Sequence, residues 1–162
     1  MDEAIGVGDE GGFAPPASQP HEYLDLVTEA AAEAGYCGRV VFGMDPASSE
    51  FFRNGKYDLG FKSGKSDELS PKQLMELYRT LLKKYPIILL EDPFAENDWD
   101  TWTEFNKECK VELVGDDLLV TNPEFVQKAH DKKSCNSMLL KINQIGTITE
   151  AIAASVLPWC TK

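Results

Sequence analysis

The amino-acid sequence predicts an α/β fold built on a parallel β-sheet. Short apolar runs alternate with amphipathic segments along most of the chain, and this alternation is typical of strand–helix units joined by right-handed crossovers. Three of the apolar runs end in an acidic residue, and the fourth ends near a lysine. The interval from Glu91 to Asp116 equals the interval from Asp116 to Lys141. This regular spacing favours successive strand–helix units of one sheet.

The clearest strand lies within the sequence YPIILLEDPF, residues 85–94. The four apolar residues at its centre are bounded by prolines, a pattern typical of a strand that is buried on both faces. The strand then runs directly into Glu91 and Asp92, and Pro93 ends regular pairing. A buried strand that ends in two acids is expected to open onto a functional site at that end.

Three further strands are predicted from the same pattern. They cover Val40–Asp45, Val111–Gly115 and Ser137–Ile142. Asp45 precedes Pro46, and a residue before proline is held in an extended conformation, so Asp45 is expected to continue its strand. The polar stretch 46–69 contains turn signals such as Asn54–Gly55. This stretch is longer than a simple connection needs, and it predicts a hairpin or another excursion.

Helices are predicted between the strands. The most regular one begins at Ser70, where a capping box reaches Gln73 and Pro71 occupies the first helical position. Leu74, Leu77, Tyr78, Leu81 and Leu82 then recur at helical spacing. The other predicted helices cover residues 21–34, 99–107, 121–132 and 147–156.

Composition limits the classes of function. The chain has 162 residues, which suits one domain, and a formal net charge of −11 from 27 acidic and 16 basic residues. An acidic chain of this kind argues against binding to nucleic acid or to an anionic membrane. It contains no apolar run long enough to span a bilayer. The acidic residues near Met1 do not fit a secretory signal, so we expect a cytoplasmic protein.

The glycine-rich sequence GVGDEGG, residues 6–12, matches the spacing of a dinucleotide-binding loop. No strand precedes it, as that motif requires, and Asp9 and Glu10 would repel a pyrophosphate. We interpret the glycines as permitting a tight backbone bend that places a carboxylate.

The charged strand ends predict a metal-dependent active site. Because the carboxyl ends of parallel strands face the same way, we expect Asp45, Glu91, Asp116 and Lys141 to converge. Three close carboxylates repel one another unless a cation lies between them, and ligands that are all oxygen atoms favour Mg²⁺. A lysine beside a divalent cation suits removal of a proton next to a carboxylate.

Five motifs along the chain resemble signatures of the enolase family, the phosphopyruvate hydratases. They are GDEGGFAP at 8–15, MDPASSEF at 44–51, LEDPF at 90–94, GDDLLVTNP at 115–123 and LLKINQIGT at 139–147. The resemblance covers about residues 6–152. It implies a partial TIM-type barrel, corresponding to about strands 3 to 6 of an enolase-like eight-stranded barrel with their helices.

The resemblance also implies a role for each residue of the site. Asp45, Glu91 and Asp116 match the Mg²⁺ ligands. Lys141 matches the base that removes the C2 proton of 2-phosphoglycerate, and Glu10 matches the acid that helps the C3 hydroxide to leave as phosphoenolpyruvate forms. Glu91, Asp116 and Lys141 would also contact the substrate. The family is cytoplasmic and commonly homodimeric.

The chain departs from the family pattern in three ways. The N-terminal enolase domain and the first two barrel strands have no counterpart in residues 1–162, the phosphate-binding His-Arg-Ser-Gly-Glu-Thr segment is absent from them, and residues 153–162 diverge. Because a barrel of this type needs ~250 residues to close, we expect the chain alone to be marginally stable. We also expect it to be silent in phosphoenolpyruvate formation, even with weak Mg²⁺ affinity.

Two alternatives to an enolase fragment stay open at this level. One is a non-catalytic, enolase-derived product with a binding or regulatory role, which the divergent tail favours. The other is an unrelated Mg²⁺-dependent α/β phosphatase or sensor, although an Asp-x-Asp motif after the first strand is lacking.

Overall fold

A computed structural model describes residues 6–8, 11–62 and 64–157. Its main feature is a four-stranded sheet in the order β1-β5-β6-β7, in which every neighbouring pair is parallel. The strands are β1 (Phe42–Met44), β5 (Ile87–Glu91), β6 (Glu112–Gly115) and β7 (Ser137–Met138). Within the described residues β1 and β7 each pair on one side only, so the sheet does not close. The prediction of an α/β fold forming part of a barrel is confirmed.

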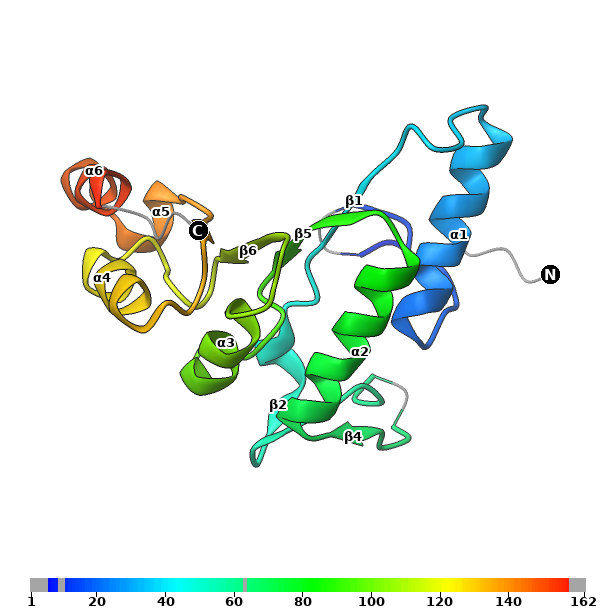
Figure 1. Cartoon of the computed structure of the whole chain (residues 1–162), viewed down its shortest axis with the longest axis horizontal. Coiled ribbons are helices and arrows are strands. Elements are labelled where there is room, and N and C mark those ends of the chain that lie inside the picture. Colours follow the sequence, from blue (N-terminus) through cyan, green and yellow to red (C-terminus); the bar gives the residue numbers. More distant parts are fainter. Residues whose placement is uncertain (1–5, 9–10, 63, 158–162) are drawn as a thin grey trace.

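Helices alternate with these strands, as Figure 1 shows. They are α1 (Pro20–Glu33), α2 (Pro71–Lys84), α3 (Trp99–Asn106), α4 (Pro123–Lys132), α5 (Ile142–Ile145) and α6 (Ile148–Val156). The predicted capping box of α2 is present: Gln73 N donates to the Ser70 hydroxyl, while the Gln73 side chain accepts from Ser70 N. Among the described helices, none has the length and apolarity needed to cross a bilayer.

The strand register brings the acidic ends level. Met44 pairs with Leu90, and Glu91 pairs with Val114. Asp45 and Asp116 therefore follow their strands close to the position where Glu91 ends β5. The carboxyl edge of the sheet thus carries one acidic residue from each of three adjacent strands.

The predicted strand Ser137–Ile142 is wrong in its second half. Regular β7 pairing ends at Met138, one more ladder bond runs from Leu139 N to Gly115 O, and α5 begins at Ile142. Lys141 N donates to the Thr121 hydroxyl, so it is not available to a neighbouring strand. Lys141 therefore lies at the N-cap of a short helix.

The polar stretch after β1 forms a separate small antiparallel sheet, which confirms the predicted excursion. It contains the 3₁₀ turn η1 (Ser48–Phe51) and the strands β2 (Phe52–Arg53), β3 (Lys56–Asp58) and β4 (Glu68–Leu69). The fully buried Tyr57 on β3 donates its hydroxyl hydrogen to Asp98, and the same oxygen accepts from Ala95 N. These bonds connect the excursion to the loop that follows β5.

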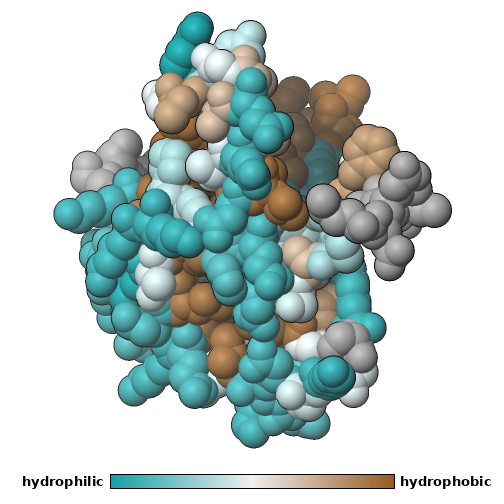
Figure 2. Space-filling view, turned by 90° about the vertical axis from the view of Figure 1, so that its right-hand side faces the viewer, coloured by the Kyte–Doolittle hydropathy of each residue, from teal (hydrophilic) through white to brown (hydrophobic). Residues whose placement is uncertain are grey.

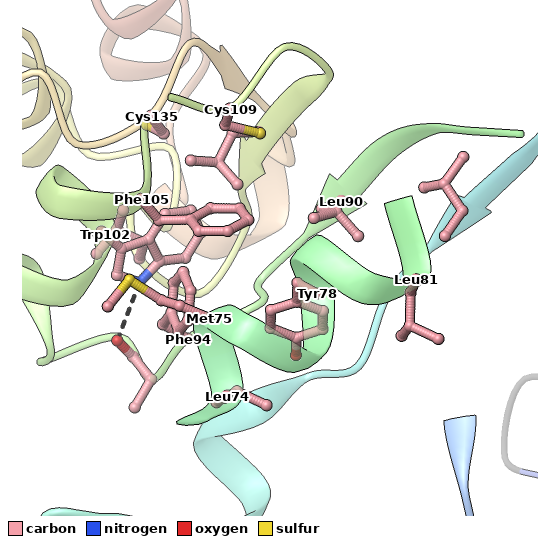
Figure 3. Packing of buried hydrophobic residues seen from close by; sticks show 14 of the residues in the cluster. Leu74, Met75, Tyr78, Leu81, Leu90, Phe94, Trp102, Phe105, Cys109 and Cys135 are labelled. Carbon is pink, nitrogen blue, oxygen red and sulfur yellow. Dashed lines mark hydrogen bonds between the residues drawn. The ribbon is translucent and has the colours of Figure 1, made fainter. Parts of the chain in front are cut away.

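The core fills the space between β5 and the helices α2 and α3. Figure 3 shows Tyr78 and Leu81 of α2 facing Leu90, with Leu74 farther along the same helix and Phe94, Trp102 and Phe105 grouped to one side. Phe94 makes edge-to-face contacts with Tyr78, Trp102 and Phe105. The Trp102 indole donates to Ala95 O, which satisfies its polar atom inside this cluster. The packing anchors the segment that directly follows Glu91.

The excursion offers a test of its close packing. A Cβ atom added at Gly60 would lie 1.6 Å from the carbonyl oxygen of Lys65, and backbone cannot rotate away as a side chain can. We expect Gly60→Ala to lower the free energy of unfolding by about 1–3 kcal/mol, measured by urea denaturation. Gly12→Ala is the matched control because a Cβ atom there meets nothing within 4 Å. Equal stability of the two variants would contradict the expectation.

Candidate active site

The structure brings four of the five predicted site residues to the carboxyl edge of the sheet. Asp45 follows β1, Glu91 ends β5, Asp116 follows β6, and Lys141 lies just before α5. Asp45, Asp116 and Lys141 all act electrostatically on the carboxylate of Glu91. The fifth residue, Glu10, falls outside the described residues.

The described residues on the two sides of positions 9 and 10 contact each other. Gly8 N donates to Gly12 O, and Val7 and Phe13 form an antiparallel bridge. Gly11 has a φ of 83°, a conformation that glycine adopts readily. The positive φ of Gly11 agrees with the role predicted for the glycines, whereas the carboxylate that they were predicted to place lies outside the described residues.

Asp116 is the most enclosed of the predicted ligands, and both of its carboxylate oxygens have a donor. Lys141 Nζ donates to Oδ2 over 2.6 Å, and Gln144 Nε2 donates to Oδ1 over 2.8 Å. The hydrogen bond to Asp116 raises the pKa of Lys141. In the metal-free chain Lys141 is therefore a protonated counter-ion.

Among the residues that the structure describes, no cationic side chain forms such a pair with Asp45 or Glu91. The pKa of Glu91 is raised, first by partial loss of water and then by repulsion from Asp45 and Asp116. The pKa of Asp45 is also raised. The main cause is loss of water to the surrounding protein, although the residue is still exposed at the surface, and repulsion from Asp116 and Asp117 adds to it. The edge of the sheet therefore concentrates negative charge beyond what one lysine neutralises.

This donor set suits Mg²⁺. Asp45, Glu91 and Asp116 offer only carboxylate oxygens, which hard divalent cations prefer. Their mutual repulsion is the electrostatic condition that a bound cation relieves. These three residues would hold the ion if it binds as the resemblance implies. Of the three, only Asp116 belongs to the group of described carboxylates whose ligand atoms lie within 4.8 Å of one another.

Asp92 is a carboxylate beside the site that the sequence did not distinguish from its neighbour. One ligand atom each of Asp92, Asp116 and Asp117 lie within 4.8 Å of one another, an arrangement that resembles a metal site. However, Asp92 is only 3% exposed, and its oxygens accept from Asp116 N and Asp117 N. Burial raises its pKa to about 7 against the opposing effect of these two donors. The Asp92 carboxylate therefore acts as a structural connection between the ends of β5 and β6.

Two uncharged residues were also missed by sequence reasoning. Thr121 Oγ1 accepts from Lys141 N, and Gln144 contacts both Thr121 and Asp116. The nearest signal in the sequence was that both lie inside the motifs that contain Asp116 and Lys141. Their hydrogen bonds cross between two strand–helix units, and spacing along the chain does not reveal such contacts.

An open groove of about 840 Å³ lies next to this edge, between α1, the excursion and α2. Its lining is largely apolar, and of the site residues that the structure describes only Asp45 lines it. Figure 2, which views the α1 side, shows hydrophobic residues exposed between hydrophilic ones. The charged side chains that converge at the strand ends therefore lie mostly outside the groove.

Comparison with known families bears on the fold of the chain. The family model described as "Enolase, C-terminal TIM barrel domain" matches residues 1–159 of the chain. The parallel sheet and the helices that alternate with its strands fit that description. The chain therefore belongs to the family of enolase C-terminal TIM barrel domains.

Proposed function

We propose that the chain serves an enolase-type, Mg²⁺-dependent dehydration of 2-phosphoglycerate to phosphoenolpyruvate. The observation that carries this proposal is the convergence of Asp45, Glu91, Asp116 and Lys141 at one edge of the sheet. In a member of this barrel family, three carboxylates and a lysine in this arrangement support proton abstraction next to a substrate carboxylate.

The proposed reaction divides between two residues of the chain. Lys141 Nζ would accept the proton from C2, and the electron pair released would form the double bond between C2 and C3 as hydroxide leaves C3. Glu10 would donate the proton that converts this hydroxide to water. When bound, Mg²⁺ would neutralise the carboxylates, lower the pKa of Lys141 and stabilise charge on the substrate carboxylate.

Asp116 would have a double role in this scheme. In the metal-free chain it holds Lys141 in the protonated form through the 2.6 Å ion pair. A base must be unprotonated when it accepts the C2 proton, so the pair must weaken before Lys141 can act. Ligation of Asp116 to a cation would compete for the same carboxylate charge.

Exchange of the C2 proton tests the proposal at the half-reaction that these residues would perform. The chain is incubated with 2-phosphoglycerate and Mg²⁺ in D₂O, and loss of the C2 proton signal is followed by NMR. We expect exchange that chelator stops and that Lys141→Met removes, without accumulation of phosphoenolpyruvate. Lys128→Met is the control, since Lys128 lies over the Trp99 ring and away from the strand ends. Absence of Mg²⁺-dependent exchange would overturn the proposal and favour a non-catalytic role.

A further inference from the structure

We infer that Thr121 is a positioning residue that orients both Asp116 and Lys141. This inference rests on the proposed function, because it gives Thr121 a role through the proposed ligand and the proposed base. Three features of the structure support it: a strained turn, a buried hydroxyl and a set of hydrogen bonds that connects Thr121, Gln144, Asp116 and Lys141.

The turn after β6 has an unusual backbone. Val120 and Thr121 have φ values of 42° and 55°, so two consecutive β-branched residues adopt the left-handed conformation. Residues of this type rarely occupy that region, and such strain is concentrated at functional sites. The turn is held by hydrogen bonds from Leu119 N and Val120 N to Asp116 O. The strained segment is therefore attached directly to the proposed ligand.

The turn points the Thr121 hydroxyl into the protein, where the residue is fully buried. This hydroxyl accepts from Lys141 N over 2.8 Å and donates to Gln144 Oε1 over 3.3 Å. It uses its one hydrogen toward Gln144 and a lone pair toward Lys141. The hydroxyl thus connects the segment after β6 with the segment after β7.

The contact with Thr121 also fixes the side-chain amide of Gln144. Because Gln144 Oε1 faces the Thr121 hydroxyl, Gln144 Nε2 is directed to Asp116 Oδ1 at 2.8 Å. Lys141 Nζ takes the other oxygen of the same carboxylate. Asp116 is therefore held through one oxygen by a neutral donor and through the other by the lysine. The neutral donor keeps the carboxylate oriented when the lysine moves away.

Divalent-cation binding separates this role from a simple packing role. Residues that orient metal ligands typically change metal affinity by about 10–100-fold. We expect Thr121→Val, which keeps the β-branched shape and loses the hydroxyl, to weaken Mg²⁺ binding by this factor in isothermal titration of the chain. Thr121→Ser keeps the hydroxyl and should keep the wild-type affinity.

Coupling between the two residues gives a second readout. Gln144→Leu should weaken Mg²⁺ binding as much as Thr121→Val, and the double variant should lose no more than either single variant, since both remove the same connection. Additive losses, or a Thr121→Val variant with unchanged affinity, would overturn the inference. Gln144 is only half-buried, so its variant keeps the test available if Thr121→Val does not fold.

The metal-free chain provides an independent readout that does not depend on the proposed function. In the wild type, the Gln144 side-chain amide should give NMR signals displaced from those of solvent-exposed glutamines. These signals should move to the exposed position in Thr121→Val and remain displaced in Thr121→Ser. If the wild type bound no Mg²⁺ but showed this pattern, the proposed function would be excluded and the positioning role of Thr121 would stand. If the Gln144 signals were unchanged in Thr121→Val, the positioning role of Thr121 would be excluded.

Discussion

Replacing Glu91 with glutamine is expected to weaken Mg²⁺ binding strongly and to stabilise the metal-free chain slightly. Both effects arise from the loss of one negative charge, which repels the neighbouring carboxylates in the metal-free chain but attracts a bound cation. Glu91 lies among Asp45, Asp116 and Asp117, and their repulsion contributes to its raised pKa. Glutamine removes one negative charge from this group, and it also removes the charged ligand that a cation would bind.

The magnitudes follow from the position of the side chain. Loss of residues that only orient ligands costs about 10–100-fold in metal affinity, so loss of a direct ligand should cost at least about 100-fold. Because solvent screens a half-buried carboxylate, the gain in stability without metal should be at most about 1 kcal/mol. Isothermal titration measures the affinity, and thermal unfolding in chelator measures the stability.

Glu112→Gln is the matched control for Glu91→Gln. Glu112 lies on the neighbouring strand β6 and is exposed, so its replacement removes the same charge away from the carboxyl edge. Both quantities should stay near the wild-type values. If Glu91→Gln destabilised the metal-free chain as well, Glu91 would have a structural role and the account of charge repulsion would be wrong.

The sequence predicted those parts of the fold that depend on local patterns. The α2 capping box and the acidic strand ends follow from residues close together in the chain. The prediction that β5 is buried on both faces is wrong: Ile87 and Leu90 are buried, but Ile88 between them is 54% exposed, because the described sheet is open and no described element covers its second face there. The length of β7 did not follow from local patterns either, because the chain leaves the ladder after Leu139 and Lys141 N donates to the Thr121 hydroxyl in the turn after β6. A run of apolar residues indicates a strand but does not show where its last N–H finds a partner.

The candidate site, like the fold, could be predicted from the sequence only in part. Asp45, Glu91, Asp116 and Lys141 could be selected because parallel strands place their carboxyl ends together. Glu91 and Asp92 are adjacent acids, and the sequence gives no physical reason to assign one to a cation and the other to the backbone. The difference arises because Asp92 has a φ of 40° and turns its carboxylate toward the N–H groups after β6. Only three-dimensional structure reveals that turn.

Replacing Asp92 with alanine is expected to lower the free energy of unfolding by about 2–6 kcal/mol. The carboxylate accepts from Asp116 N and Asp117 N in a buried position, and each donor left without a partner costs about 1–3 kcal/mol. Alanine also fits poorly at a positive φ. Urea denaturation in chelator measures the loss.

Two other substitutions at Asp92 separate these causes. Asn tolerates the positive φ, keeps one acceptor oxygen and removes the negative charge whose burial raises the pKa of Asp92, so Asp92→Asn should be less destabilising than Asp92→Ala. Asp92→Gly removes the carboxylate but relieves the backbone strain, so it should be less destabilising than Asp92→Ala. If Asp92→Gly matched the wild type in stability, the strained backbone and not the pair of hydrogen bonds would explain the effect.

The affinity for Mg²⁺ then distinguishes a structural role of Asp92 from a role as a metal ligand. Asp92→Asn should change Mg²⁺ affinity by no more than the about 10–100-fold effect of a residue that orients ligands, well short of the effect of Glu91→Gln. Asp92 oxygens that already accept two backbone hydrogen bonds offer little to a cation. A larger loss of affinity in Asp92→Asn than in Glu91→Gln would transfer the ligand role to Asp92. The cation would then lie among Asp92, Asp116 and Asp117, where the carboxylates also approach one another.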